Sequence, residues 1–454
     1  MSTPLWNGFV YEQHQVAGIR WMKEREDAPS HRGGLLCDEM GLGKTIQMIG
    51  LLKESTLKSN LFFGPLPVLE QWRATATKAG INCWIAKSGA WEPPSKVSLR
   101  APNLYLVNYE AAIKNPDLFA KHWDRVICDE AHRMANKGAS WTLIKEIECE
   151  IHWFLTATPI VNKVSDVNAL FEMLGLNYTP SLLSTYVLAR SMEEMRPVLP
   201  NLPKKEIQMT HILDFDTEDE ADFYRGIQGD IKRRFRALAD EGGAGGALDK
   251  LKLIMRLRQI SLHPQIYIEG RRKALGPSLY TRPDWIDPST KFQGIRDLVE
   301  KDSEPKKWIV FCHFHKEMEL LKEFLGFSDK IDNIWLYHGG LSAGQRTAVL
   351  EQTAKPNGGK HEILLIQLQS GGTGLNLQHF QSIVFSGPWW TAALMDQAIG
   401  RAVRIGQKAQ VVVHHMILKE EQGLNIDRLM KNKAEKKGKL CMDFLEAADH
   451  DVSL

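Results

Sequence analysis

Short apolar runs alternate with helix-patterned segments in two separate zones of the chain. The first zone contains GGLLCDE, SNLFFGPL, NLYLVNYE, DRVICDE and HWFLTAT, and the second contains KKWIVFCHF, NIWLYHGG, HEILLIQLQ, SIVFSGPWW and VVVHHMI. Nearly continuous apolar runs separated by helices are typical of strands that are buried on both faces of a parallel sheet. The pattern therefore predicts an α/β fold with two parallel-sheet lobes, each with helices on both faces of its sheet.

Between the zones the pattern changes to long amphipathic helices. TEDEADFYRGIQGDIKRRFRALAD and KLKLIMRLRQISLHP have helical periodicity, and the glycine-rich segment DEGGAGGALDK between them predicts a loop. We therefore expect a first lobe at residues 1–175, helical protrusions with a linker at residues 176–290, and a second lobe at residues 291–454.

Composition and charge narrow the class of protein. A chain of 454 residues is too long for one hydrophobic core, and its net charge of +2 means that any nucleic-acid surface must be a local basic stripe. No segment approaches about 18 consecutive apolar residues, and MSTPLWNGF lacks the regions of a signal peptide, so we expect an intracellular protein with no membrane partner. The six cysteines have no metal-ligand spacing and are predicted to be reduced.

The segment LLCDEMGLGKTIQMIG, residues 35–50, predicts a phosphate-binding loop between a strand and a helix. Two glycines would let its backbone N–H groups converge on a phosphate, Gly41 and Gly43. Lys44 would contact the β- and γ-phosphates of ATP, and Thr45 would bind Mg²⁺. The usual pattern has a glycine where this chain has Asp38, so for this segment alone a surface turn that carries a lysine stays open.

Two adjacent carboxylates follow another apolar strand, DRVICDE. At the carboxyl end of a strand, Asp129 would hold Mg²⁺ through water, and Glu130 would orient or deprotonate the attacking water. A solvated loop explains two acids alone, but the acids and the phosphate-binding loop together favour a site for ATP and Mg²⁺. Thr156 and Thr158, in FLTATPI, would place hydroxyl groups at the edge of the same sheet.

Together these motifs resemble the Swi/Snf family of double-stranded-DNA translocases, within helicase superfamily two. The nucleotide loop of that family commonly reads D-E-M-G-L-G-K-T, as residues 38–45 do here, so the resemblance makes Asp38 the family's own form and part of the nucleotide site. HQVAGIRWM resembles the family's Q-motif, which implies that Gln15 reads the adenine edge and that Trp21 braces the segment. In the segment that resembles the Thr-Gly-Thr-Pro motif, Ala157 replaces the more usual glycine and Val161 the more usual glutamine.

Further motifs extend the resemblance from about residue 9 to about residue 420. FFGPLPVLEQW, LQSGGTGLNLQ, LRQISLHP and STKFQGIRDLV are each similar to family segments, and the last two separate this family from general RNA helicases. The resemblance implies two RecA-like lobes with a helical insertion between them. It also implies a compact, motor-only form, as in large DNA viruses or bacteria.

The segment DQAIGRAVRIGQ, residues 396–407, is similar to the last motif of the family at every fixed position. If the segment is helical, Arg401 and Arg404 lie one turn apart on the same face and both would reach a γ-phosphate as arginine fingers. Gln397 belongs to the same catalytic motif. For an isolated pair of arginines, a solvated basic helix is the alternative. Trp389 and Trp390 are more typical of packing than of stacking on a base.

The resemblance implies an ATP-hydrolysing motor that contacts the backbone of double-stranded DNA with little sequence preference. The expected backbone contacts lie near Gln71, Arg346, Gly372 and Thr373. We expect displacement or remodelling of DNA-bound protein, with a nucleosome or a polymerase as possible partner and the nucleus or another DNA-containing compartment as location. A strand-separating helicase on DNA or RNA, and an ATP-dependent transcription termination factor, stay open as alternatives.

Overall fold

The computed structural model describes residues 3–240, 245–371, 375–404, 406–419 and 425–447. The chain forms two compact units. The first comprises Met1–Leu202, Arg404–Gly406 and Lys436–Leu454, and the second comprises Pro203–Val403 and Gln407–Glu435. Among the helices in the described ranges, none combines the length and apolarity needed to cross a bilayer.

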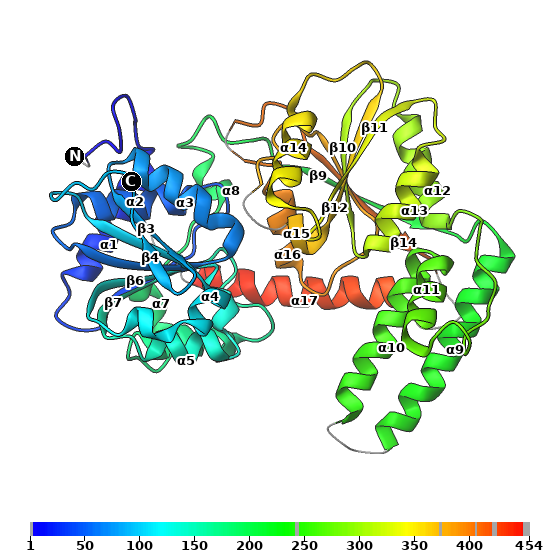
Figure 1. Cartoon of the computed structure of the whole chain (residues 1–454), viewed down its shortest axis with the longest axis horizontal. Coiled ribbons are helices and arrows are strands. Elements are labelled where there is room, and N and C mark those ends of the chain that lie inside the picture. Colours follow the sequence, from blue (N-terminus) through cyan, green and yellow to red (C-terminus); the bar gives the residue numbers. More distant parts are fainter. Residues whose placement is uncertain (1–2, 241–244, 372–374, 405, 420–424, 448–454) are drawn as a thin grey trace. The chain divides into compact units, whose positions relative to one another are not determined.

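The first unit is built on an eight-stranded sheet with the order β4-β3-β5-β2-β6-β7-β1-β8 (Figure 1). Its strands are β1 Arg32–Leu36, β2 Ser59–Gly64, β3 Asn82–Lys87, β4 Ala90–Glu92, β5 Asn103–Asn108, β6 Trp123–Asp129, β7 Cys149–Leu155 and β8 Val187–Leu188. All neighbouring strands are parallel except β3 and β4. The five strands predicted in the first zone are confirmed, whereas β3, β4 and β8 were not predicted.

Helices cover both faces of this sheet. They are α1 Gln13–Glu26, α2 Lys44–Glu54, α3 Leu66–Lys78, α4 Tyr109–Lys114, α5 Ala139–Lys145, α6 Asn168–Met173, α7 Leu183–Tyr186 and α8 Met192–Met195. Strand residues alternate between two cores: Phe62 packs with side chains of α1, α2 and α3, whereas Leu61 and Phe63 pack with side chains of α4 to α7. Burial on both faces explains why these strands are apolar at nearly every position.

The second unit contains a six-stranded, all-parallel sheet with the order β11-β12-β10-β13-β14-β9. Its strands are β9 Ile207–Leu213, β10 Lys307–Cys312, β11 Ile331–Tyr337, β12 His361–Gln367, β13 Ser382–Phe385 and β14 Val412–Leu418. The five strands predicted in the second zone are confirmed. β9 lies in the section for which we predicted only helices and linker, and it forms an edge of the sheet with mostly exposed side chains.

The helices of the second unit are α9 Glu218–Asp240, α10 Gly245–Leu262, α11 Pro264–Leu275, α12 Thr290–Lys301, α13 His315–Leu325, α14 Ala343–Ala354, α15 Leu368–Gly371 and α16 Ala392–Ile399. The last helix, α17 Ile426–Ala447, begins in the second unit and belongs to the first unit from Lys436 onward. The predicted helical insertion is confirmed: α9, α10 and α11 pack against one another as the green helices of Figure 1. The glycine-rich segment between α9 and α10 is only partly a loop, because α10 already begins at Gly245. Residues 241–244 of that segment lie outside the described residues.

Candidate nucleotide-binding site

The predicted phosphate-binding loop connects the end of β1 to the start of α2. Gly41 and Gly43 both have left-handed backbone conformations, with φ of 95° and 82°. A Cβ atom on Gly43 would lie 2.6 Å from Nε2 of Gln15, so the loop approaches the Q-motif glutamine as closely as a glycine allows. The loop and the start of α2 therefore have the shape that brings backbone N–H groups to a phosphate.

Lys44 and Asp129 meet in this unit although they come from different elements. Lys44 is the first residue of α2, and its ammonium group donates a hydrogen bond to the backbone carbonyl of Asp38, at 2.6 Å. The positive charge of Lys44 also acts on the carboxyl group of Asp129 and partly opposes the rise of its pKa, whose largest cause is burial. Thr45 follows on α2 and is half-buried. The structure thus places the predicted phosphate-binding lysine close to the predicted magnesium-binding carboxylate.

Asp38 is bound by other side chains of the first unit. Its side chain is fully buried. One carboxylate oxygen accepts a hydrogen bond from Nε of Arg190 at 2.9 Å, and the other accepts one from Nε2 of Gln47 at 2.8 Å. Both oxygens point into the unit, so the Asp38 side chain supports the shape of the loop. The place of Asp38 in the nucleotide site stays a prediction.

Asp129 is the last residue of β6 and is held by two hydrogen bonds. The indole N–H of Trp72 donates to Oδ2, and the backbone N–H of Glu130 donates to Oδ1, both at 2.9 Å. Burial, and next the charge of Glu130, raise the pKa of Asp129 to about 6, against the lowering effects of Trp72 and Lys44. The sequence identified the Gln-Trp motif but not this contact, because nothing in the pattern says where an indole N–H points.

Glu130 lies in a left-handed backbone conformation, with φ of 50°, which is uncommon for a residue other than glycine. Its Oε2 atom lies 3.4 Å from Nδ1 of His132. Burial lowers the pKa of His132 to about 4, so at neutral pH this contact joins a carboxylate to a neutral imidazole. The same Nδ1 atom is 3.1 Å from Oγ1 of Thr156, which accepts a hydrogen bond from the backbone N–H of Thr158. His132 therefore links Glu130 to the end of β7.

The Q-motif segment is docked directly on the phosphate-binding loop. The ring Nε2 atom of His14 lies 2.8 Å from the carbonyl oxygen of Leu42. The adjacent side chain, Gln15, is buried, and its Oε1 atom accepts a hydrogen bond from the backbone N–H of Glu12. Trp21, which we expected to brace the segment, lies against Trp153 of β7 with ring centroids 5.5 Å apart.

The last motif, residues 396–407, differs from the predicted geometry. Helix α16 ends at Ile399 and Gly400 caps it, so Arg401 and Arg404 lie in turns and the prediction that they share a helix face is wrong. The carbonyl of Arg401 accepts a hydrogen bond from the backbone N–H of Leu377 at 3.0 Å, so a distant segment uses a carbonyl that a continuing helix would need.

Two glutamines of this motif are held inside the second unit. Gln397 is buried on α16. Gln407 donates hydrogen bonds from its side-chain amide to the carbonyls of Gln378, at 2.7 Å, and Phe380, at 3.1 Å. The motif is therefore folded against the segment that follows α15, although Gly372 and Thr373, two of the predicted DNA contacts there, lie outside the described residues.

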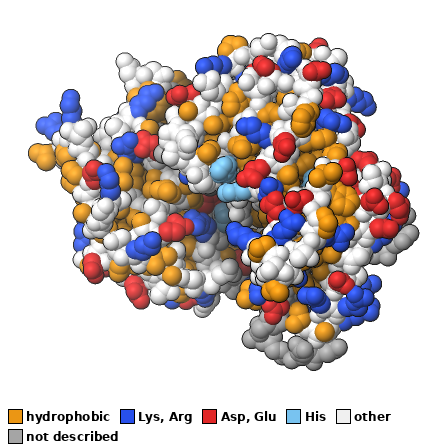
Figure 2. Space-filling view, turned by 45° about the vertical axis from the view of Figure 1, so that its right-hand side comes forward, with side chains coloured by type: hydrophobic (Ala, Val, Ile, Leu, Met, Phe, Trp, Pro, Cys, Tyr) orange, Lys and Arg blue, Asp and Glu red, His pale blue; other side chains and the backbone are white. Residues whose placement is uncertain are grey.

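The other two predicted DNA contacts differ in their surroundings. Gln71 is exposed on α3. Arg346 is half-buried, and its guanidinium donates to the carbonyls of Leu341 and Gly339, at 3.0 and 3.2 Å. Arg346 thus holds a turn together. On the face shown in Figure 2, basic and acidic side chains are interspersed.

Trp389 is a packing residue in the second unit, as its type suggests. Its ring stacks on His313 with centroids 5.2 Å apart and an interplanar angle of 8°. The guanidinium of Arg258, on α10, lies 4.4 Å from the centroid of the Trp389 ring. These contacts join the helical protrusion to the ends of β10 and β13.

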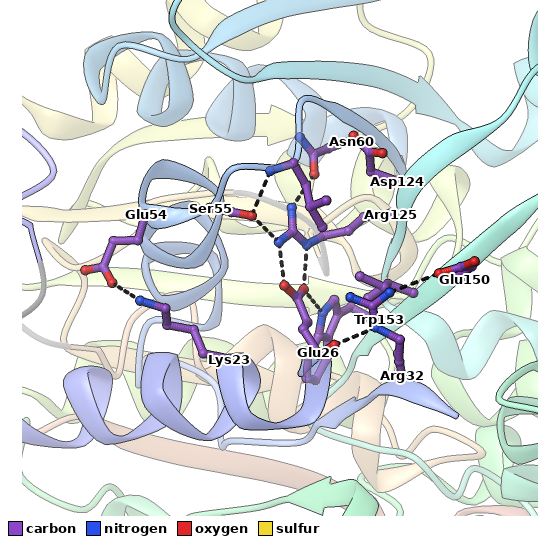
Figure 3. Close-up of polar contacts among 12 residues, drawn as sticks. Lys23, Glu26, Arg32, Glu54, Ser55, Asn60, Asp124, Arg125, Glu150 and Trp153 are labelled. Atoms are coloured by element: carbon purple, nitrogen blue, oxygen red, sulfur yellow. Dashed lines mark hydrogen bonds and ion pairs between the residues drawn. The ribbon is translucent and has the colours of Figure 1, made fainter. Parts of the chain in front are cut away.

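A buried ion pair joins α1 to β6 (Figure 3). It lies at the ends of these two elements that are away from Gln15 and Asp129. Glu26 is the last residue of α1, and it pairs with Arg125 near the start of β6. Arg125 also donates to Oδ1 of Asn60 at 2.8 Å and to Oγ of Ser55 at 2.7 Å, while Trp153 donates to Glu26 at 2.8 Å. The sequence did not predict this network, whose partners lie far apart along the chain.

Family models and known proteins match this chain along most of its length. A model of the SNF2-related domain matches residues 14–183, and a model of the helicase conserved C-terminal domain matches residues 290–406. The chain is 29% identical over 460 residues to a probable global transactivator of Orgyia pseudotsugata multicapsid polyhedrosis virus, covering 94% of this chain and 89% of the viral protein.

Two longer relatives are matched over part of their length. The chain is 26% identical to an uncharacterized ATP-dependent helicase, MG018, of Mycoplasma genitalium, covering 97% of this chain and 44% of that protein. It is also 26% identical to the nuclear protein STH1/NPS1 of Saccharomyces cerevisiae, covering 90% of this chain and 33% of that protein. The chain thus spans less than half of these two relatives. A solved structure of the Sulfolobus solfataricus SWI2/SNF2 ATPase core in complex with dsDNA aligns over 100% of both chains, with 21% identity and a TM-score of 0.41.

Proposed function

Because the chain belongs to the Swi/Snf family of ATPases in helicase superfamily two, we propose that it uses ATP hydrolysis to move along double-stranded DNA. The movement would displace or remodel proteins bound to the DNA. The observation that carries the proposal is in the first unit, where Lys44 of the glycine-containing loop is near enough to Asp129 for its charge to act on that carboxyl group.

In the proposed site each side chain has one role. Gln15 recognises the adenine edge, and backbone N–H groups between Gly41 and Gly43 bind phosphate oxygens. Lys44 neutralises the β- and γ-phosphates. Glu130 orients the attacking water and accepts its proton, and the unusual backbone of this residue supports that role, since strained conformations gather at functional sites.

The donor set fits magnesium held jointly by protein and nucleotide. Within the described part of the chain, no group of three or more His, Cys, Asp or Glu side chains could hold a metal ion by itself. Mg²⁺ needs no such cage, because it is usually bound by one or two carboxylates, water and substrate phosphates. Thr45 and Asp129 would hold it, and it would neutralise charge on the phosphates. The raised pKa of Asp129 supports this assignment, since a bound cation would stabilise the ionised carboxylate.

Arg401 and Arg404, in the motif that contains Gln397, would act as the arginine fingers. Their positive charges would stabilise the charge that develops on the γ-phosphate in the transition state. We expect Arg404→Ala to lower turnover by about 10³-fold or more while ATP and DNA still bind. Weaker DNA binding with unchanged turnover at saturating DNA would contradict the finger role.

The proposed partner is the phosphate backbone of duplex DNA, near Gln71, Arg346, Gly372 and Thr373. The names of two relatives support a role on DNA or in its compartment: a viral transactivator and a yeast nuclear protein. Binding through phosphates should weaken as salt rises and should depend little on sequence. A nucleosome or a polymerase is the proposed target, and the nucleus or another DNA-containing compartment is the proposed location.

Side-by-side measurement of ATP hydrolysis with duplex DNA, single-stranded DNA and RNA tests the proposal. We expect the strongest stimulation by duplex DNA, with displacement of a protein roadblock and no separation of strands. Glu130→Gln, which should bind ATP and DNA without turnover, is the control that links displacement to hydrolysis. Strand separation, or stronger stimulation by single strands or RNA, would replace the proposal with a helicase. Activity that requires co-purified polymerase would replace it with a termination factor.

A further inference from the structure

One buried guanidinium joins three separate parts of the first unit. Arg190 follows β8 and is 6% exposed. Its Nε and Nη2 atoms donate to the two carboxylate oxygens of Asp38 in the phosphate-binding loop. Nη2 also donates to Oε1 of Gln47 on α2 at 2.9 Å, and Nη1 donates to the backbone carbonyl of His14 on α1. The loop, helix α2 and helix α1 therefore all bind the side chain of Arg190.

The contacts around Arg190 leave little freedom to these parts. Gln47 donates back to Asp38 at 2.8 Å, which closes the network. Helix α1 reaches the network only because Gly18 has no side chain: a Cβ atom there would lie 1.9 Å from Oε1 of Gln47 and 3.0 Å from Nη2 of Arg190. A guanidinium can serve all three parts because its donors form a rigid planar fork, which the single ammonium group of a lysine does not provide.

The network fixes the position of Gln15 relative to the phosphate-binding loop. His14, whose carbonyl Arg190 binds, directly precedes Gln15, and the His14 ring contacts the carbonyl of Leu42 in the loop. A Cβ atom on Gly43 would lie only 2.6 Å from Nε2 of the Gln15 amide. In a bound nucleotide the base lies at a fixed distance from the phosphates. A shift of α1 relative to the loop would therefore move Gln15 away from the base, while the contacts between loop and phosphates would change less.

We propose that Arg190 is a positioning residue that gives this ATPase its preference for adenine nucleotides, by holding Gln15 in register with the phosphate-binding loop. The inference rests on the proposed role of Gln15 in reading the base. It assigns the function of Asp38 as well: the aspartate that stands in place of a glycine is the anchor through which Arg190 holds the loop.

The decisive measurement is the ratio of kcat/KM for ATP to kcat/KM for GTP. Both values come from the same preparation, so the ratio does not depend on the fraction of enzyme that is folded. We expect Gln15→Ala and Arg190→Lys each to lower the ratio by about tenfold, the effect of losing a hydrogen bond to a charged or base-reading group. Gly18→Ala, which would displace Gln47, should lower it in the same direction.

Arg125→Lys is the matched control. Arg125 forms a buried ion pair in the same unit, with Glu26, and it contacts α1 at the other end of that helix (Figure 3). The substitution should lower thermal stability as Arg190→Lys does, yet leave the nucleotide ratio unchanged.

The outcomes distinguish the proposed role of Gln15 from the proposed role of Arg190. Equal use of ATP and GTP by the unmodified protein, or no effect of Gln15→Ala, would overturn the adenine role of Gln15 and the inference with it. A lowered ratio in Gln15→Ala but not in Arg190→Lys would overturn the inference alone. An equal fall in Arg125→Lys would show a general loss of packing and would also overturn it. Stimulation by duplex DNA is measured separately and tests only the proposed translocase.

Discussion

The hydrogen bond between Trp72 and Asp129 offers a sharp test of the proposed magnesium site. Trp72 is 1% exposed, and its ring packs on Phe62 with centroids 4.3 Å apart. In Trp72→Phe an aromatic ring still packs on Phe62, but the N–H group that donates to Oδ2 of Asp129 is lost. The carboxylate then keeps the hydrogen bond from the backbone N–H of Glu130 to its other oxygen.

The substitution should change the Mg²⁺ requirement strongly and the turnover at saturating Mg²⁺ much less. A hydrogen bond to a charged group contributes about 1.5 to 3 kcal/mol, and loss of a residue that orients a metal ligand lowers metal affinity by about 10- to 100-fold. We therefore expect the Mg²⁺ concentration for half-maximal ATP hydrolysis to rise by about 10- to 100-fold. At saturating Mg²⁺ the turnover should recover most of its value, because the carboxylate itself is still present.

Steady-state ATP hydrolysis, titrated with Mg²⁺ at constant free ATP, measures this effect. Trp123→Phe is the matched control: Trp123 is fully buried in the same unit, and its indole N–H donates to the backbone carbonyl of Phe119, at 3.3 Å. Both substitutions should destabilise the fold, but only Trp72→Phe should change the magnesium requirement. An unchanged requirement in Trp72→Phe, or an equal shift in the control, would refute the assignment of Asp129 as a magnesium ligand oriented by Trp72.

Three further predictions follow from the first unit. Glu130→Gln should bind ATP but hydrolyse it about 10²- to 10⁴-fold more slowly, as single-turnover assays can show, and near-normal turnover would contradict its role as general base. Glu26→Gln should lower the free energy of unfolding by about 3 to 5 kcal/mol, because it leaves the charge of Arg125 buried and unpaired. In denaturant melts the double variant Glu26→Leu with Arg125→Met should cost less than the two single changes together, and strict additivity would contradict the pairing. Burial lowers the pKa of His152 to about 4, so the unfolded chain takes up a proton at pH 6.5 and the folded chain does not. Stability should therefore fall by up to about 3 kcal/mol as pH decreases from 6.5 to 4. His152→Leu should flatten this slope in melts, unlike His122→Leu at a side chain that is 53% exposed, and identical slopes would disprove the account.

Local patterns were sufficient for the strands and for the motifs of the nucleotide site. All ten predicted strands form, because a parallel strand covered on both faces must be apolar wherever it lies in the sheet. The predicted phosphate-binding loop was also recognisable, because its glycines and Lys44 lie within one short segment, between the end of β1 and the start of α2.

Sequence patterns did not predict the secondary structure correctly where contacts with a distant part of the chain, or exposure at a sheet edge, determine it. β9 was missed because it is an edge strand with mostly exposed side chains, so it lacks the apolar run of a buried strand. The helix expected through Arg404 ends at Ile399, and the carbonyl of Arg401 is bound by the backbone N–H of Leu377. Helical spacing alone gave no indication of that contact.

The sequence by itself determined the two α/β lobes and the resemblance to a family, and it supplied the candidate residues for ATP, since each follows from spacing within a short segment. Only the tertiary structure decided what holds those residues in place. Asp38 and Arg190 are 152 positions apart, and Glu26 and Arg125 are 99 apart. A buried charge needs an oppositely charged partner close to it in space. The residues that lie between two such partners in the sequence do not indicate that the two will pair.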